Sequence, residues 1–345
     1  MAIDTIRVQP SPRARSAPLP LALVTYLPVA LLLWIGSGIG LPVALQGLTP
    51  RVQGLVTIFL GIFIEALPFV VAGVLVSSLI ALFVSESFIR RLAPRHGPSA
   101  AVMGSLLGLL FPVCECGTVP TTRRLLHKGA PLPFGIAFLL AAPVVNPIVI
   151  ASTYVAFNGD WLMVGSRFGL TLLIAISVAI VMSWLPRQHT LLSPSLAHAP
   201  EGCGCENHNH SRSIAGVFRH SAEELIEMSR WLILGALLAA TLQTFVSQST
   251  LLSIGQGPIL SVVVLMALAV MLSICSTVDA FIALALSATF GPGALIAFLV
   301  FGPMIDIKST LMFLTTLSAR AVTIIIALVV PLVLVAGVLI NLVAG

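Results

Sequence analysis

The sequence predicts an all-α integral membrane protein built from inverted repeats, and its composition, its apolar stretches and an internal repeat lead to this fold class. Only 8% of the 345 residues are charged and 58% are hydrophobic, whereas soluble domains carry about 25% charged residues. The composition excludes a cytosolic enzyme, a disordered chain and a conventional nucleic-acid-binding protein. The net charge of +5 is therefore interpreted as loop charge that sets the orientation of the chain in the membrane.

The long apolar stretches predict seven full spans, because about 20 apolar residues cross a bilayer as a helix. Residues 1–20 form a polar, basic tail, and the apolar run after this tail is too long for the core of a signal peptide. We therefore expect this run to be retained as a first membrane helix. In chain order, the predicted spans are residues 21–45, 54–84, 132–157, 161–185, 223–247, 294–316 and 319–343.

Two further apolar stretches, 99–120 and 258–290, are interrupted by polar residues and helix breakers, and each is predicted to enter the membrane and return as a re-entrant hairpin. If residues 99–120 crossed the membrane instead, the basic loops at 85–98 and 121–130 would face opposite sides. That arrangement would contradict the excess of Lys and Arg in cytoplasmic loops. Hairpins leave both loops and the N-terminus in the cytoplasm. Nine full spans remain the alternative.

Polar landmarks recur in the same order in the two halves, at a nearly constant spacing. The pairs are Glu65 with Glu227, Cys116 with Cys275, and Asn146 with Asp306. If the interrupted stretches are hairpins, an odd number of spans separates the two glutamates, so the repeats are inverted, as in many transporters. The predicted organisation is a cytoplasmic tail (1–20), an extra transmembrane helix (21–50), a first repeat (51–185), a cytoplasmic Cys- and His-rich linker (186–222) and a second repeat (223–345).

The tips of the two hairpins carry the residues that we expect to bind a substrate. The first tip contains Cys114-Glu-Cys-Gly-Thr118 between two prolines, and the second contains Cys275. Pseudo-symmetry would bring the tips together, and thiols at the midplane would favour soft cations and thiophilic metalloids over hard ions. Free cysteines are also often small core residues, and that interpretation stays open, above all for Cys275. The candidate substrate-binding residues are Cys114, Glu115, Cys116, Gly117, Thr118, Asn146, Cys275, Thr277, Asp279 and Asp306.

Acidic residues within the spans are candidates for coupling transport to a proton gradient, because ionisable groups in a membrane usually face a pathway or a partner. Glu65 lies near the middle of its span. Glu227 and Arg230 are three residues apart, so they share a helical face on which they can pair. These three residues are the coupling candidates.

The sequence also predicts the surroundings of four polar residues. Asp306 and Lys308 are two residues apart, which places them on different faces of a continuous helix. Arg167 is expected near the outer end of its span, where its side chain can snorkel to the interface. Glu224 is expected at the cytoplasmic interface, without a special role.

The linker contains a Cys-x-Cys element, Cys203 and Cys205, closely followed by His208 and His210. Thiolate and imidazole ligands suit zinc, copper and related soft ions. The flanking residues are polar and small, so transient metal capture and a plain solvated linker remain equal alternatives. We expect no resident cofactor elsewhere.

The motif Phe111-Pro-Val-Cys-Glu-Cys-Gly-Thr-Val-Pro120, followed by Ala142-Pro-Val-Val-Asn-Pro147, resembles the pattern of the YraQ/ArsP-type predicted permeases. The resemblance covers residues 50–343. It implies an inner-membrane permease, and a characterised branch of that family exports trivalent organoarsenicals. The implied site residues are Cys114, Cys116 and Asn146.

The expected function is therefore the export of a thiophilic metalloid or soft-metal species by an inner-membrane permease with a cytoplasmic N-terminus. The alternatives are a membrane thiol-redox or metal-handling component that moves no solute, and an assembly or anchoring subunit. No Walker loop, nucleophile elbow or His-Glu-x-x-His motif is present, so we do not expect an enzyme. The expected partners are the lipid bilayer and a small inorganic or organometalloid substrate, without nucleic acid, and a homo-oligomer is left open.

Overall fold

The computed structural model describes residues 34, 49–83, 89, 94, 97–110, 114–185, 191–192, 214–245 and 257–344. The predicted span 21–45, apart from Trp34, lies outside the described residues, as does most of the predicted linker. Residue contacts divide the chain into two units, Met1–Val56 and Thr57–Gly345.

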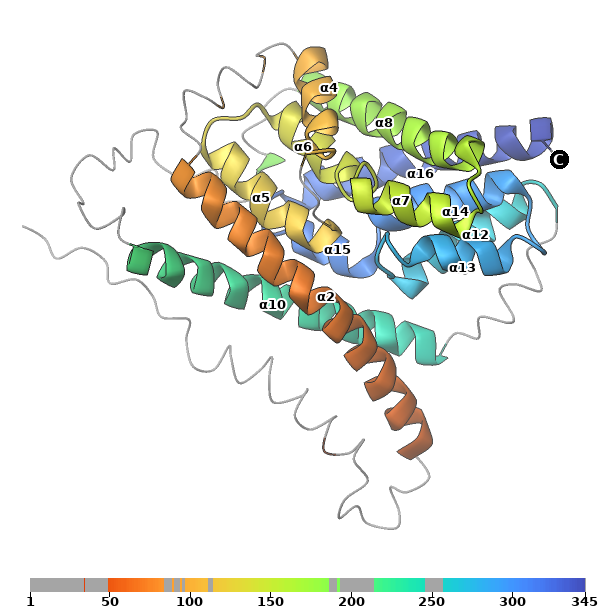
Figure 1. Ribbon diagram of the computed structural model, residues 1–345, viewed down its shortest axis with the longest axis horizontal. Helices are drawn as coiled ribbons and strands as arrows, with labels where there is room; N and C mark the ends of the chain where they lie inside the picture. Colours follow the sequence, from red (N-terminus) through yellow and green to blue (C-terminus); the bar gives the residue numbers. More distant parts are fainter. Residues whose placement is uncertain are drawn as a thin grey trace, which may run out of the picture. The chain divides into compact units, whose positions relative to one another are not determined.

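Within the described residues the fold is all-α, and the only strand-like pairing is an isolated bridge between Leu192 and Leu317. Five helical segments are long and apolar enough to cross a membrane, so the chain is a multi-pass membrane protein. The helices, labelled in Figure 1, are α2 (Thr49–Phe83), α4 (Gly97–Leu107), α5 (Glu115–His127), α6 (Leu132–Ala141), α7 (Pro147–Ala156), α8 (Trp161–Trp184), α10 (Ile214–Phe245), α12 (Leu260–Leu272), α13 (Asp279–Leu286), α14 (Pro292–Met304), α15 (Ile307–Phe313) and α16 (Ala319–Ala344).

The same succession of elements occurs twice among these helices. A long helix (α2 or α10) is followed by two short ones (α4 and α5, or α12 and α13), by a broken pair (α6 and α7, or α14 and α15) and by a second long helix (α8 or α16). The polar landmarks of the sequence occupy matching places in this order. The exact domain boundaries and the number of full spans stay predictions.

The predicted spans 132–157 and 294–316 are not continuous helices, and each is broken at its midpoint. Asn146 caps α7 by accepting a hydrogen bond from the backbone N–H of Ile148 at 3.0 Å, and Pro147 begins that helix. Asp306 caps α15 in a reciprocal arrangement with Ser309. The prediction that Asp306 and Lys308 lie on different faces of one helix is therefore wrong, because the cap residue lies outside the helix that contains the lysine.

Contacts of two glycines show that the first hairpin turns back. A Cβ on Gly104 would lie 2.2 Å from the carbonyl oxygen of Phe134, and one on Gly108 would lie 2.6 Å from the Cα of Ala142. The earlier glycine contacts the start of α6 and the later glycine contacts its end, so α4 and α6 run in the same direction. The intervening α5 must then run back. Gly97, at the start of α4, lies against Ser183 near the end of α8.

The second hairpin turns back in the same way but starts from the other end of the unit. Gly302 near the end of α14 lies against Ala269 near the end of α12, and Asn341 near the end of α16 binds the backbone at the starts of both helices. The start of α16 lies on the side where α8 ends, because the N–H of Ser318 donates to the carbonyl of Leu191. The two hairpins therefore enter from opposite ends, as inverted repeats require.

The hairpin arms are too short to cross a membrane individually. The longest arms, α5 and α12, have 13 residues each, which is about 20 Å of helix against a hydrocarbon core of about 30 Å. Residues 121–127, expected as a loop, instead form the last turns of α5. Broken backbone of this kind is tolerated in a membrane only when protein buries it or when it lines a water-filled cavity.

Candidate functional site

The candidate site lies where the first hairpin begins its return. Cys114 is the N-cap residue of α5, and Glu115, Cys116 and Gly117 form its first turn. A Cβ on Gly73 of α2 would lie 2.3 Å from the Cα of Gly117, so the two helix backbones touch at this point. The two glycines therefore allow α2 to pack directly against the Cys-Glu-Cys turn.

Three cysteines from the two hairpins meet at this site. Cys114, Cys116 and Cys275 are all free and buried. The thiol of Cys114 is close enough to interact with the thiols of both Cys116 and Cys275, and the hydroxyl of Thr277 donates to the Cys275 sulfur at 3.6 Å. The structure thus brings together sulfurs that are far apart in the sequence.

A buried lysine lies beside the thiols and bridges two carboxylates. The Nζ of Lys308 is 2.9 Å from Oε1 of Glu115 and 3.6 Å from Oδ2 of Asp306. It also donates to the carbonyl of Ser273 at 2.8 Å. All three charged residues are at most 2% exposed. A buried charge is stable only when it is paired, so this triad is a single electrostatic unit.

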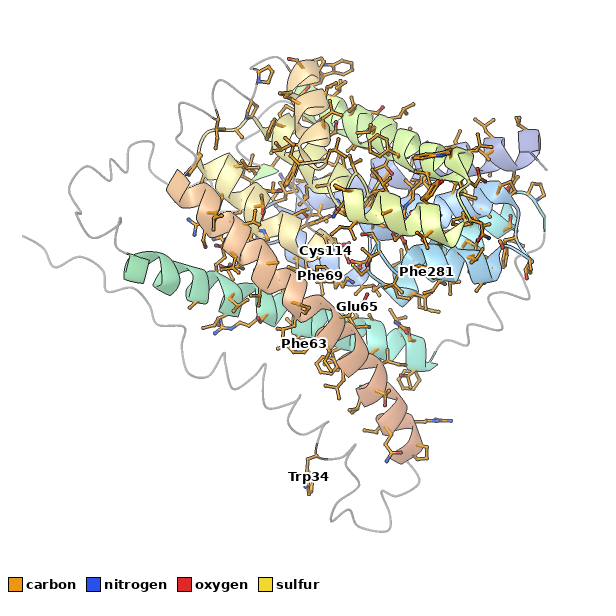
Figure 2. The ribbon with its side chains drawn as sticks, viewed as in Figure 1. Trp34, Phe63, Glu65, Phe69, Cys114 and Phe281 are labelled. Carbon is orange, nitrogen blue, oxygen red and sulfur yellow. The ribbon has the colours of Figure 1, made fainter. Side chains whose placement is uncertain are left out.

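Glu65 approaches the same triad from α2. Its carboxylate lies close enough to interact electrostatically with Lys308, Glu115 and the backbone of Cys275. Figure 2 labels Glu65 on α2 and Cys114 at the start of α5. Oε1 of Glu65 is buried and has no hydrogen-bond partner. Glu65 is therefore the coupling candidate that lies at the thiol site.

Asp279 belongs to a second buried ion pair, with a residue for which we predicted a different environment. Arg167 of α8 is 2% exposed and does not snorkel to an interface. Its guanidinium donates to Oδ2 of Asp279 at 2.7 Å, to the hydroxyl of Thr153 at 2.7 Å and to the carbonyl of Ser276 at 3.2 Å. The prediction for Arg167 is wrong because the buried face of α8 faces these acceptors.

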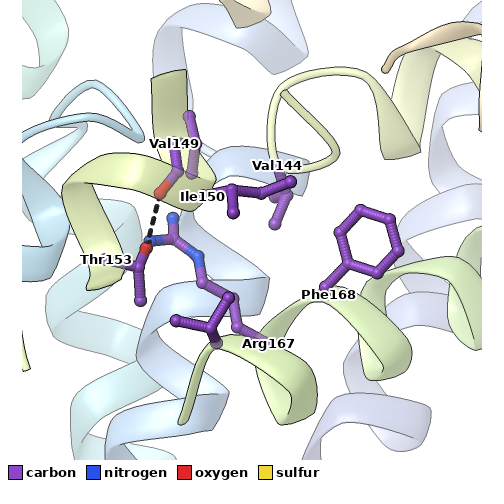
Figure 3. A pocket seen from close by; sticks show the side chains of 7 residues that line it. Val144, Val149, Ile150, Thr153, Arg167 and Phe168 are labelled. Carbon is purple, nitrogen blue, oxygen red and sulfur yellow. Dashed lines mark hydrogen bonds between the residues drawn. The ribbon is translucent and has the colours of Figure 1, made fainter. Parts of the chain in front are cut away.

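Two small pockets lie on either side of this ion pair. Arg167 and Thr153 line one pocket (Figure 3), and Asp279 lines the other with Phe298 and Pro303. The walls of both are otherwise mostly apolar. The Arg167–Asp279 pair therefore links the wall of one pocket to the wall of the other.

Several predicted site residues have structural contacts instead. The side chain of Asn146 caps α7, and the hydroxyl of Thr118 donates to the carbonyl of Glu115 within α5 at 2.8 Å. Gly117 provides the close approach to α2. Their assignment to substrate binding stays a prediction.

The other two coupling candidates, Glu227 and Arg230, belong to α10. Glu227 pairs with Arg123 at 2.8 Å and not with Arg230, whose Nε is buried without a hydrogen-bond partner. Glu224, expected to have no special role, is buried and lies 3.3 Å from Arg124. These two ion pairs connect the end of α5 to α10. The sequence did not predict this contact, because the first hairpin was expected to end at residue 120.

No group of three His, Cys, Asp or Glu side chains in the described part of the chain is arranged to hold a metal ion. The thiol cluster is therefore not a preformed metal site in this state. The predicted metal ligands of the linker, Cys203, Cys205, His208 and His210, lie outside the described residues.

The comparisons with known proteins identify the family. A family described as predicted permeases, ArsP_1, matches residues 51–342. The chain belongs to this family. The match covers both repeats, from α2 to α16, so the thiols, the lysine triad and the Arg167–Asp279 pair all lie in the permease core.

Two relatives of this permease extend over most of its length. The UPF0718 protein YcgR of Bacillus subtilis (strain 168) is 45% identical over 285 residues, which cover 83% of this chain and 96% of that protein. A Streptococcus mutans serotype c (strain ATCC 700610 / UA159) protein, provisionally named as a two-component membrane permease complex subunit, is 36% identical over 258 residues, covering 74% of this chain and 84% of the relative. No solved structure matches the chain.

Sequence reasoning missed Lys308 and Arg167 as members of the permease site. A clue to Arg167 was available, because Val164, Thr171 and Ile174 lie three, four and seven residues away and share its buried face. No comparable clue existed for Lys308. Its partner Glu115 is in the other repeat, so only the fold brings them together.

Proposed function

We propose that this permease exports a thiophilic metalloid or soft-metal species, such as a trivalent organoarsenical, through a central site lined by cysteines. The observation that carries the proposal is the meeting of three free, buried thiols, Cys114 and Cys116 from one hairpin and Cys275 from the other. Both repeats supply sulfur, so a movement of one repeat against the other changes the sulfur geometry. Such a site can favour binding in one state and release in another.

The substrate chemistry follows from the ligands. Thiolates prefer soft ions and metalloids to hard cations. A monoorganic trivalent arsenical reacts with two thiols, R–As(OH)₂ + 2 Cys–SH → R–As(S–Cys)₂ + 2 H₂O, so it needs no third protein ligand. This agrees with the lack of a preformed three-ligand site among the described residues.

In this proposal the protein lies in the inner membrane with its N-terminus in the cytoplasm, and it acts as a transporter and not as an enzyme. Proton antiport would supply the driving force, with Glu65 as the coupling residue. Its unpaired carboxylate oxygen beside the lysine triad supports this role. Transient metal capture by the linker at 203–210 would raise the local substrate concentration without a resident cofactor.

Uptake into inverted membrane vesicles tests the proposal. Vesicles with the wild-type protein should accumulate trivalent methylarsenical or antimonite when a proton gradient is imposed, whereas Cys114→Ser and Cys116→Ser should reduce uptake to the level of empty vesicles. The matched control is Cys203→Ser/Cys205→Ser, which removes two thiols from the linker and should keep uptake at saturating substrate.

Full uptake by a Cys114→Ser/Cys116→Ser variant present at wild-type level would contradict the thiol site. Thiol trapping in cells addresses the alternative of a redox component, because a permease should keep Cys114 and Cys116 reduced throughout transport. A trapped Cys114–Cys116 bond that forms and disappears with substrate would favour the redox function instead.

We also propose that the permease works in an assembly, since the Streptococcus mutans relative is named as a complex subunit. The partner is a second membrane component or another copy of this chain. Mild-detergent purification with cross-linking would separate these two cases by the mass and composition of the complex.

A further inference from the structure

Lys308 connects the two hairpins through its ammonium group. Glu115 belongs to the first hairpin and Ser273 to the tip of the second, and Nζ lies 2.9 Å from the carboxylate of one and 2.8 Å from the carbonyl of the other. The ammonium is also close enough to Cys116 and Cys275 to interact electrostatically with both sulfurs. The ammonium of Lys308 is thus the positive group that the carboxylate of Glu115 and the carbonyl of Ser273 share at the thiol site.

The acidic groups around Lys308 outnumber its ammonium group. Three carboxylates, Glu65, Glu115 and Asp306, surround one ammonium. Oε2 of Glu115 and Oε1 of Glu65 are buried and have no hydrogen-bond partner. Buried acceptors without a donor are unfavourable, so this cluster attracts additional positive charge.

The backbone of Lys308 is held in place while its side chain is long. Asp306 and Ser309 cap the helix on either side of it, and Gly235 of α10 packs against its Cα, where a Cβ would lie only 2.6 Å away. The four-carbon side chain has free torsions. The ammonium can therefore leave Glu115 without a movement of α15.

We propose that the ammonium of Lys308 is a built-in cation that occupies the place of a positively charged substrate and is exchanged for it. A soft cation that binds the thiols and Glu115 meets repulsion until the lysine withdraws, and it then replaces the lysine as the partner of the carboxylate. A neutral thiol-reactive compound has no charge to exchange. Lys308 therefore makes the site discriminate by charge, because it weakens the binding of a cation and leaves the binding of a neutral thiol-reactive compound unchanged, a property that rests on the proposed thiol site.

Binding to the purified full-length protein in lipid nanodiscs tests this exchange with two probes, the soft cation Cd²⁺ and the neutral thiol reagent phenylarsine oxide. Lys308→Met should tighten Cd²⁺ binding by about tenfold or more, because one competing charge is removed. It should change phenylarsine oxide binding by less than about twofold, because that probe carries no charge. Lys308→Arg should keep the wild-type ratio of the two affinities.

Lys308→Met/Glu115→Gln is the charge-balanced control, and it should lose the gain in Cd²⁺ affinity. Equal tightening of both probes would show that the lysine is only a steric plug and would overturn the proposal. Unchanged or weaker Cd²⁺ binding by folded Lys308→Met would overturn it as well.

A measurement on the wild-type protein covers the case in which Lys308→Met does not fold. Saturating Cd²⁺ should increase acylation of Lys308 by a membrane-permeant amine reagent at least about threefold, read by mass spectrometry, because a lysine released from its carboxylates is a free nucleophile. Unchanged acylation with Cd²⁺ bound would overturn the exchange.

Cys114→Ser separates the two proposals. If it abolishes binding of both probes while the Lys308 tests fail, the thiol site stands and only the exchange is wrong. If it leaves both probes bound, the thiol site is wrong and the exchange falls with it.

Discussion

At the scale of single residues, two buried ion pairs join the repeats of this permease. Glu115 of the first repeat pairs with Lys308 of the second, and Asp279 of the second pairs with Arg167 of the first. Charges removed from water are costly, and the attraction compensates only when the geometry is good and the other polar atoms are bonded. Each ion pair therefore joins a residue of one hairpin to a helix of the other repeat.

Arg167→Met is expected to destabilise the protein because it leaves Asp279 as an uncompensated buried charge. Removal of one partner of such a pair costs about 3–5 kcal/mol, while replacement of both by apolar residues is often nearly neutral. The melting temperature in detergent, followed by tryptophan fluorescence, should therefore fall strongly for Arg167→Met and recover in Arg167→Met/Asp279→Leu.

The exposed Arg320 at the start of α16 is the matched control, and Arg320→Met should leave the melting temperature within a few degrees of wild type. An Arg167→Met protein as stable as this control would show that the Arg167–Asp279 pair does not hold the second hairpin.

The residues of the thiol site were partly predictable. Cys114, Cys116 and Cys275 could be expected together because the internal repeat aligns the two hairpin tips, and the structure does bring their sulfurs together. Arg167 and Lys308 were not predicted, because a charge in an apolar helix has many conceivable partners. The choice among them depends on distances across the fold that the local sequence does not contain.

At the scale of elements, helix breaks and glycine contacts shape the site. Asn146 and Asp306 cap new helices in the middle of two apolar stretches, which frees backbone groups at that depth. Gly73 lets α2 touch α5 at the Cys-Glu-Cys turn, and Gly235 lets α10 touch α15 at Lys308. In both repeats, the glycine eight residues after the glutamate allows the first long helix to pack against the site.

Gly73→Ala should disturb the site, because its Cβ would lie 2.3 Å from the backbone of Gly117, where no flexible side chain can move away. Overpacking of this kind costs about 1–3 kcal/mol. Gly61→Ala is the control on the same helix, where a Cβ meets nothing within 4 Å, and it should be neutral or stabilise the helix by up to about 1 kcal/mol.

The measurement combines the melting temperature with uptake into inverted vesicles, and Gly73→Ala should lower both while Gly61→Ala lowers neither. Equal behaviour of the two variants would mean that α2 does not contact α5 closely in the membrane.

At the scale of the whole molecule, the order of helices repeats and the hairpins enter from opposite ends. This inversion follows from glycine and asparagine contacts that align α4 with α6 and α12 with α14. It agrees with the distribution of basic residues in the loops, which also favours hairpins. A permease of this kind can alternate between two faces by moving one repeat against the other.

Labelling with a membrane-impermeant maleimide checks the inversion. In a Cys203→Ser/Cys205→Ser background, His127→Cys at the end of α5 should react only in inverted vesicles, and Thr289→Cys after α13 should react only in right-side-out vesicles. Both positions are exposed, while Cys114, Cys116 and Cys275 are buried. Reaction of both new cysteines from one side would contradict inverted repeats.

The membrane location, the helical class and the repeat were predictable from the sequence, because these depend on composition and on the order of polar landmarks along the chain. The sequence also singled out the cysteines, since a polar break in an apolar stretch is visible locally. The folded structure was needed to show that two predicted spans are broken, that α5 extends to His127 and that Glu115 faces Lys308. A buried charge takes its partner from whichever element the fold places within a few ångströms, and that distance is not encoded in spacing along the chain.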